Sequence, residues 1–508
     1  MSTRTRTRKQ KLALNTATSL FYELTTVVCG LILPRLVMEA YGSEVNGLVH
    51  SIAQFLHVVA FLDMGVGSVV QSALYKPLAE GDLAATSGIV ASAQRFFRRI
   101  AGILLVYVVF LIGVYPCFAH GDFDWGYSAL LVAAMSISSF AQYYFGIVDR
   151  LLLLANQEGY VQYTAQIATI ILNTAACAVI IKLGASIQMV KLVTSLIFLV
   201  RPFALRLYVN RHYRIDRHIR LVGEPIKQKR NGIAQHVSYV VLTGTDNIVL
   251  TLFSTLSNVS IYSVYHLVIY GIKLLFLSMT NGIKAIIGEL WARQDLQRLD
   301  SVFGMTEFAM HAATVWVFTC TWKLILPFVG IYTAGVTDAE YIQPLFAAVL
   351  LLAHAIHCLR IPYNMLILAT GAYRESQNMH IATAVINIVI SVAAVSFFGL
   401  IGVAVGTLVA LLYQTTWMVV FDSRNNIRWP LAKVGRQVAF DLCAVAAILL
   451  ATAFVGTDAE NFLKFAVSAA EVAAVAALVV AGLSFLFYRK QLGGFLLLVK
   501  GRRRKAAA

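Results

Sequence analysis

The sequence predicts an all-α integral membrane protein with about fourteen transmembrane helices. First, 59% of the 508 residues are hydrophobic and only 13% are charged, about half the usual charged share of a soluble domain. Second, apolar stretches of about 20 residues, each long enough to cross a bilayer, recur along the whole chain. Third, strand-like alternation is absent, and a lipid-exposed segment must satisfy its own backbone hydrogen bonds. A soluble protein, a disordered chain and a disulfide-rich scaffold are therefore excluded.

Taken in order, the apolar stretches predict fourteen spans. Spans 11 and 12 are separated only by residues 399–401. The first span follows basic residues, as the apolar core of a signal peptide does, but its length, Glu23 and the lack of a small-x-small cleavage site indicate an uncleaved helix. The expected spans lie near residues 12–38, 47–73, 100–118, 126–149, 160–183, 188–208, 232–256, 259–286, 303–327, 342–368, 378–398, 401–421, 438–456 and 463–487.

The net charge of +16 is distributed very unevenly. If the helices alternate, 32 of the 41 Lys and Arg residues lie in the two tails and the connections on one side, and the connections on the other side contain none. The positive-inside rule then places both termini in the cytoplasm. The membrane is expected to be a bacterial-type plasma membrane. Basic segments such as 206–230 also predict contact with anionic membrane lipids. No nucleic-acid partner is expected, because the chain has no basic domain with interleaved aromatic residues.

The chain resembles itself at an offset of roughly 215 residues. Residues 61–64 match 276–279, and residues 167–169 match 381–383. A unit of six spans is therefore predicted to occur twice. Because six is an even number, both copies have the same orientation in the membrane, and they are expected to be related by an axis along the membrane normal. The predicted domains are a first lobe (1–208), a basic linker (209–231), a second lobe (232–421), helices 13 and 14 (422–487) and a basic tail (488–508).

Several diffuse motifs carry a resemblance to a known family; they lie at residues 33–35, 41–48, 62–67, 72–78, 245–250, 259–263 and 288–291. In these motifs, and in its two predicted six-span units followed by two further spans, the chain resembles the polysaccharide (lipid-linked oligosaccharide) flippase branch of the multidrug/oligosaccharidyl-lipid/polysaccharide (MOP) exporter superfamily. The resemblance covers roughly residues 9–490. It implies a MATE-like fold and alternating access. It also implies flipping of polyprenyl-linked oligosaccharides to the outer leaflet, for cell-surface polysaccharide biosynthesis, with no enzyme activity and no cofactor. Glycosyltransferases or a glycan polymerase are the expected neighbours.

Two carboxylates are predicted within apolar spans, where a charge is costly and usually faces a cavity or a partner. Glu23 shares a helix face with several small polar residues of span 1, and Asp246 lies in the middle of span 7. Both are candidates for the substrate cleft and for coupling to H⁺ or Na⁺. The alternatives are a structural ion pair of Glu23 with Lys273 and a hydrogen bond of Asp246 with Asn247.

Basic side chains supply the other candidates for the substrate cleft. On span 8, His266, Lys273 and Lys284 share one helix face, and Lys273 lies near the bilayer centre. A lipid pyrophosphate carries concentrated negative charge, for which cations are the natural partners. Lys284 has the alternative of reaching the membrane surface. The remaining candidates are Arg35, His57 and Arg360, with an interfacial or structural role as the alternative for the two arginines.

Other polar residues are interpreted as structural. Asp63 is expected to join two helices, Asp149 with Arg150 to anchor the inner end of span 4, and Arg201 to have a structural role next to Pro202. His354 and His357 are three residues apart, but no carboxylate or cysteine completes a ligand set, so no metal is predicted.

Three rival functions remain open at this stage. A multidrug exporter of the same superfamily would need an apolar or acidic cleft for cationic drugs. A membrane enzyme acting on lipid-linked glycans would need a large outward loop with acid and base residues, and the predicted outward loops are short. A purely structural membrane scaffold would leave the charges within the spans without a role.

Overall fold

A computed structural model describes residues 8–59, 66–118, 123–217, 219, 233–427, 429–457 and 461–489. The regular elements in these ranges are all helices, so the predicted all-α fold class is confirmed. Twelve helical segments in them are long and apolar enough to cross a membrane. Large apolar side chains remain exposed on these helices, including Val106 (71%), Leu450 (73%) and Leu478 (74%). This pattern fits surfaces that face lipid.

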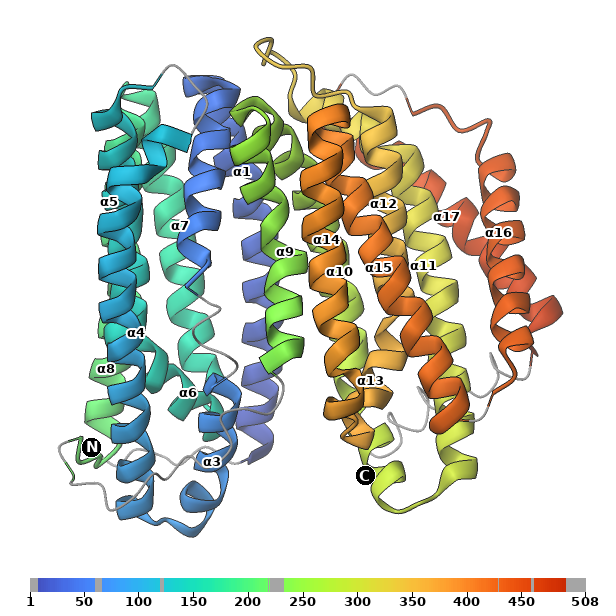
Figure 1. Ribbon diagram of the computed structural model, residues 1–508, viewed down its shortest axis with the longest axis horizontal. Helices are drawn as coiled ribbons and strands as arrows, with labels where there is room; N and C mark the ends of the chain where they lie inside the picture. The colour runs from blue at the N-terminus through green and yellow to red at the C-terminus, as the bar shows by residue number, and fades with distance from the viewer. Residues whose placement is uncertain are drawn as a thin grey trace. The chain divides into compact units, whose positions relative to one another are not determined.

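The chain divides into two compact units, residues 1–260 and 261–508, with the boundary inside one long helix (Figure 1). The first unit contains α1 (Arg8–His57), α3 (Val66–Glu80), α4 (Leu83–Phe118), α5 (Trp125–Ala141), the π-helical turn η1 (Gln142–Gly146), α6 (Ile147–Ala155), α7 (Gly159–Lys182), α8 (Ile187–His212), α9 (Ile233–Phe253) and the start of α10 (Leu256–Ala292). The second contains the rest of α10, α11 (Leu296–Tyr332), α12 (Pro344–Leu359), α13 (Ile361–Thr370), α14 (Tyr373–Phe398), α15 (Leu400–Asn425), α16 (Leu431–Ala451) and α17 (Phe462–Phe487).

The division into units differs from the predicted division into lobes. Helix α9 belongs to the first unit, whereas the sequence repeat assigns it to the second lobe. The pairing of six-span lobes therefore stays a prediction. Most of the predicted linker and nearly all of the predicted tail, residues 490–508, lie outside the described residues.

The label α1 covers two helices that meet at a kink, and they correspond to predicted span 1 and the start of predicted span 2. The first helix continues through Pro34, and the kink lies at Gly42, whose φ of 86° and ψ of 173° are outside the helical region. A side chain there would be strained, and glycine adopts this conformation freely. Helix α1 ends at His57 and is followed by a turn at residues 58 and 59, and α3 spans Val66–Glu80, so the structure describes the two ends of the predicted span 47–73 as helix and leaves out residues 60–65. Asp63 lies outside the described residues.

Spans 4 and 10 are each interrupted, which the sequence analysis did not predict. In span 4 the π-helical turn η1 separates α5 from α6, and such a turn inserts an extra residue into a helix. In span 10 the break between α12 and α13 falls at Arg360, two residues before Pro362. Proline lacks the N–H group that would continue the helical hydrogen-bond ladder, which explains a boundary at this point.

Helices α14 and α15 form a tight hairpin, as the predicted separation of spans 11 and 12 required. Gly399 alone connects them, with φ of 52°, and they lie side by side in Figure 1. A Cβ atom on Gly402 would stand 2.3 Å from the backbone oxygen of Ala394, and one on Gly406 would stand 2.1 Å from Oγ of Ser391. Glycine is therefore required at both positions for the two backbones to approach so closely.

The last two helices pack on α11 within the second unit. Their apolar contact includes Val315 and Ile448, and Trp316 donates a hydrogen bond from Nε1 to the backbone oxygen of Ala473 at 2.9 Å. His311 Nδ1 and Asp441 Oδ2 approach to 2.5 Å inside the same contact. The two helices beyond the predicted lobes are thus tied to the unit by both apolar and polar groups.

Candidate functional site

The predicted site residues of the first unit lie in different surroundings. Glu23 is half-buried on α1, whereas Asp246 on α9 is only 4% exposed. Arg35 stands 4.0 Å from the carboxylate of Glu39, one helical turn further along α1. His57 is exposed at the end of α1. The assignment of these four residues to a substrate cleft stays a prediction.

Three predicted residues of the second unit meet in a basic cluster, which consists of His266, Lys273, His354, His357 and Arg360. His354 packs its ring against His266 and His357, with centroid separations of 6.3 and 6.4 Å. Arg360 donates a hydrogen bond from Nη2 to Nδ1 of His357 at 3.1 Å. Lys273 is an electrostatic neighbour of both His354 and His357. Lys284, the fourth predicted residue of this unit, is exposed further along α10.

The basic cluster holds hydrogen-bonding atoms that the protein itself does not satisfy. Both ring nitrogens of His354, which is 3% exposed, and Nε of Arg360 are buried without a hydrogen-bond partner. Unpaired buried polar atoms are rare because each costs about 1–3 kcal/mol. The cluster therefore has the chemistry of a site that accepts hydrogen bonds and negative charge from a ligand.

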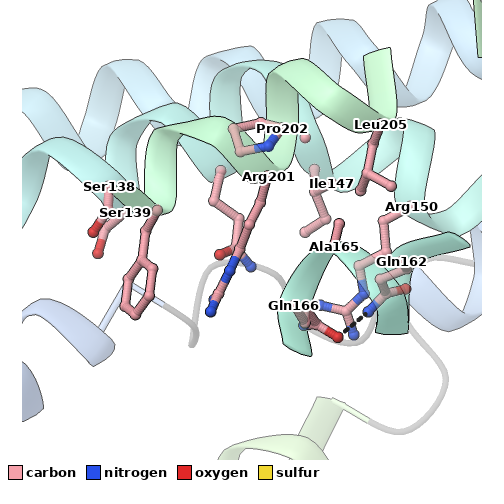
Figure 2. A pocket seen from close by; sticks show the side chains of 13 residues that line it. Ser138, Ser139, Ile147, Arg150, Gln162, Ala165, Gln166, Arg201, Pro202 and Leu205 are labelled. Carbon is pink, nitrogen blue, oxygen red and sulfur yellow. Dashed lines mark hydrogen bonds between the residues drawn. The ribbon is translucent and has the colours of Figure 1, made fainter. Parts of the chain in front are cut away.

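A second group of polar residues lines a cavity inside the first unit, between helices α5 to α8 (Figure 2). The cavity has a volume of about 100 Å³. Arg150 reaches it from α6 and Arg201 from α8, while Gln162 and Gln166 line it from α7. Close approach of the helices at one end requires Gly146, since a Cβ atom there would stand 2.8 Å from Pro202 Cβ.

Arg150 and Arg201 both line this cavity, whereas the sequence predicts an anchor at a helix end for Arg150 and a structural role for Arg201. Asp149 was expected to anchor the helix end together with Arg150, but the two side chains have separate roles. Asp149 is fully buried and pairs with Arg206 at 3.5 Å and Arg217 at 2.6 Å, while Arg150 lines the cavity. A signal was available in the sequence: Gln162 and Gln166 are one helical turn apart, so they share a face of span 5.

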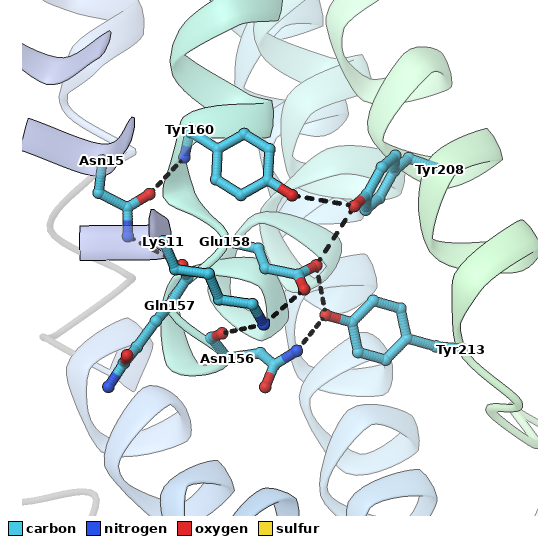
Figure 3. A network of polar contacts seen from close by, with 8 residues as sticks. All are labelled: Lys11, Asn15, Asn156, Gln157, Glu158, Tyr160, Tyr208 and Tyr213. Carbon is cyan, nitrogen blue, oxygen red and sulfur yellow. Dashed lines mark hydrogen bonds and ion pairs between the residues drawn. The ribbon is translucent and has the colours of Figure 1, made fainter. Parts of the chain in front are cut away.

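A polar network joins the start of α1 to the turn between α6 and α7 and to the residue that follows α8 (Figure 3). Glu158 accepts a contact of 2.7 Å from Lys11 Nζ and a hydrogen bond of 2.8 Å from the hydroxyl of Tyr213. Asn156 donates a hydrogen bond to the same hydroxyl at 2.6 Å. Burial, and then the negative charge of Glu158, raise the pKa of Tyr213 above its usual value. The network thus fastens the beginning of the predicted linker to the first helix.

No protein-family model and no curated protein matches the chain. Solved structures do match it. The lipid II flippase MurJ in an inward closed conformation superimposes with a TM-score of 0.68 and 15% identity, covering 94% of this chain and 100% of that one. An inward-facing multidrug resistance MATE family transporter of the MOP superfamily superimposes with a TM-score of 0.59 and 14% identity, covering 79% of this chain and 95% of that one. The MATE multidrug transporter DinF-BH in complex with R6G superimposes with a TM-score of 0.54 and 14% identity, covering 82% of this chain and 96% of that one.

The chain has the fold of the MOP exporter superfamily. The fold expected from the sequence resemblance is thereby confirmed, and it is shared by flippases and by multidrug transporters. At these identities the likeness concerns architecture only. Function therefore has to be argued from the side chains of this chain.

Proposed function

We propose that the protein transports polyprenyl-linked oligosaccharides from the inner to the outer leaflet of a bacterial-type plasma membrane, with both termini in the cytoplasm. The basic cluster on α10, α12 and the α12–α13 boundary carries the proposal. Inserting a cationic side chain near the bilayer centre costs about 2.5–3.5 kcal/mol on insertion scales, so such a residue is expected where a ligand or partner offsets this free energy. The phosphate or pyrophosphate of a polyprenyl carrier is such a ligand.

The membrane-embedded position of the cluster suits a substrate that never leaves the bilayer completely. The lipid tail would stay among the acyl chains while the phosphate and sugar cross, and rocking of the lobes would alternate access. The unpaired nitrogens of His354 and Arg360 offer hydrogen bonds to an oxyanion. No reaction on the substrate is required, and the neighbours of this fold are transporters.

The test is translocation of a short lipid-linked oligosaccharide in liposomes, read out by an impermeant reagent that modifies the sugar in the outer leaflet only. Purified protein should accelerate translocation over empty vesicles. Arg360→Gln and Lys273→Gln should each slow it by about tenfold, the loss expected for one charge-assisted hydrogen bond. Arg374→Gln, on an exposed residue of α14, is the matched control. Equal rates with and without protein would overturn the proposal.

Export of cationic drugs is the second candidate, because multidrug transporters share the fold and Asp246 is a buried acid. The same vesicles, loaded with a cationic dye, separate the two candidates. Dye transport that survives Lys273→Gln and Arg360→Gln, without acceleration of the lipid-linked glycan, would favour drug export.

A further inference from the structure

The cavity between α5 and α8 contains two arginines whose charge the protein leaves unneutralised. Nε of Arg150 and Nη2 of Arg201 are buried and have no hydrogen-bond partner. Within the described part of the chain, neither side chain forms an ion pair with a carboxylate. Asp149, the neighbour of Arg150 in the chain, is already engaged by Arg206 and Arg217. Two partly buried guanidinium groups on one cavity, each with a buried nitrogen that lacks a partner, favour the binding of an anion.

The arginines are held in place by other contacts. Arg201 donates a hydrogen bond from Nε to Oγ1 of Thr169 at 2.5 Å, and its guanidinium lies 3.9 Å from the centre of the Phe198 ring. These contacts use one edge and one face of the guanidinium, and Nη2 remains for a ligand. Arg201 is therefore positioned before any ligand arrives, which lowers the ordering cost of binding.

Gln162 supplies an independent observation at the same cavity. It is 5% exposed, and its Oε1 atom has no hydrogen-bond partner, while its Nε2 atom donates to Gln166 Oε1 at 3.3 Å (Figure 2). An unsatisfied acceptor beside unsatisfied cationic donors suits an oxyanion that carries one proton. Its O–H group donates a hydrogen bond to Gln162 Oε1, and its remaining oxygens accept hydrogen bonds from the arginines. Inorganic phosphate carries at least one proton at neutral pH. A phosphate monoester, whose second pKa is about 6, carries one in a minor fraction of molecules, and a phosphodiester carries none.

The cavity is large enough for a phosphate group. Its volume of about 100 Å³ accommodates several water-sized groups, as one phosphate group requires. The π-helical turn η1 contributes Gln142 and Gly146 to its wall, and such turns occur frequently at functional sites. The cavity thus fits the phosphate of a larger molecule or free phosphate.

We infer that Arg150, Arg201 and Gln162 form a phosphate-binding site inside the first unit. The ligand is a monoprotonated phosphate group, either the phosphate monoester of a membrane lipid or free inorganic phosphate. Arg150 and Arg201 bind the charged oxygens, and Oε1 of Gln162 accepts a hydrogen bond from the P–OH group. The inference is independent of the transported substrate, because it concerns equilibrium binding to a site whose residues are separate from the basic cluster of the second unit.

Binding to the purified full-length protein tests the inference, with three phosphate probes that can each carry a proton: inorganic phosphate, phosphatidic acid and polyprenyl phosphate. Phosphatidylcholine, whose headgroup has no net charge, is the comparison. Retention of each lipid is measured by native mass spectrometry, and inorganic phosphate by equilibrium dialysis with a radioactive label. The probe retained most tightly identifies the source of the phosphate group.

Arg150→Gln and Arg201→Gln should each weaken binding of the preferred probe by about tenfold, and the double variant by about a hundredfold. Arg211→Gln, on an exposed residue of the same helix as Arg201, should leave it unchanged. Gln162→Glu is nearly isosteric and places a carboxylate on the same cavity as Arg150, so it should compete with the phosphate and abolish binding in a folded protein.

The inference fails if Arg150→Gln and Arg201→Gln bind all three probes as well as Arg211→Gln does. It fails equally if Gln162→Glu, shown to be folded by an unchanged elution volume and helical content, retains wild-type affinity. Because no step of the assay measures translocation, either result leaves the proposed transport function to its own test.

Discussion

Asn46 donates a hydrogen bond from Nδ2 to Oγ of Ser260 at 2.7 Å, and both side chains are almost completely buried. The bond joins the second half of α1 to the start of α10. Nearby, the hydroxyl of Thr251 donates to Oγ of Ser51 at 2.7 Å. Both residues belong to the first unit of the structure, but the predicted lobes separate them, since α1 lies in the first lobe and α10 in the second. In the proposed topology this contact lies at the outer side of the membrane, where we propose that it keeps the outward path closed.

Cross-linking this contact should stop transport. The double variant Asn46→Cys, Ser260→Cys, made with the exposed Cys117 and Cys443 replaced by serine, should form a disulfide between the two new thiols on oxidation. Translocation should then fall to the level of empty vesicles and return on reduction, because alternating access requires the contact to separate. Cross-linking is checked by mass spectrometry, and the two single variants are the controls. Full transport by the cross-linked protein would contradict the assignment of this contact to the outer gate.

Gly47, next to Asn46, is expected to tolerate no side chain. A Cβ atom there would stand 1.8 Å from the backbone oxygen of Leu256. Gly47→Ala should lower the free energy of unfolding by about 1–3 kcal/mol, the usual cost of overpacking. Gly102→Ala is the matched control, since no atom lies within 4 Å of its added Cβ; it should be neutral or stabilising by up to about 1 kcal/mol. Equal unfolding curves for the two variants in a detergent titration would rule out the predicted clash.

Tyr213 should make the protein less stable at alkaline pH. Its pKa is raised in the folded state by burial and by the negative charge of Glu158. The folded state therefore keeps the proton that the unfolded chain releases near pH 10, and stability falls as pH rises above that value. Tyr213→Phe should remove this part of the decline. The measurement is the unfolding midpoint from pH 8 to 11; parallel pH curves for wild type and variant would show that Tyr213 does not contribute.

The contact between His311 and Asp441 should be strongly coupled. Replacing only one partner leaves a buried polar group without its counterpart, so Asp441→Leu should cost about 3–5 kcal/mol. The double variant His311→Leu, Asp441→Leu should recover part of that loss because the imidazole no longer remains unpaired. The rest of the loss persists, since buried Gln437 still loses its hydrogen bond of 3.0 Å to Oδ1 of Asp441. A double-mutant cycle on the unfolding free energy gives the coupling. Additive effects would mean that the 2.5 Å contact contributes little to the docking of α16.

Glu23 and Asp246 are proposed to couple transport to H⁺ or Na⁺. Neutral replacement by Glu23→Gln and Asp246→Asn should remove the ion dependence of translocation while the protein still binds the lipid-linked glycan. Glu375→Gln, on an exposed residue of α14, is the control. Transport that responds to the two ion gradients as the wild type does would eliminate these carboxylates as the coupling groups.

Most of the fold could be predicted because a membrane helix is specified locally. An apolar run of about 20 residues has few other stable conformations in lipid, and a positive-φ glycine such as Gly399 ends one span and starts the next. The helix breaks at Gly42 and Arg360 were not predicted, because a hydropathy pattern reports burial in the membrane and not backbone torsion.

The candidate sites were predictable only in part. His266, Lys273 and Arg360 were recognised singly because each is a basic residue in an apolar span. Their assembly with His354 and His357 depends on how α10 packs against α12, which no single span encodes. The pairing of Arg150 with Arg201 has the same origin, since the two belong to different helices that meet only after folding.

The hairpin of α14 and α15 has a practical consequence for measuring motion in this protein. Its backbones touch at Gly402 and Gly406, and one residue connects the helices, so the pair can move only as a single body. Two spectroscopic labels placed across it should report a constant distance in every functional state. That distance serves as an internal ruler against which the displacement of any other helix can be calibrated.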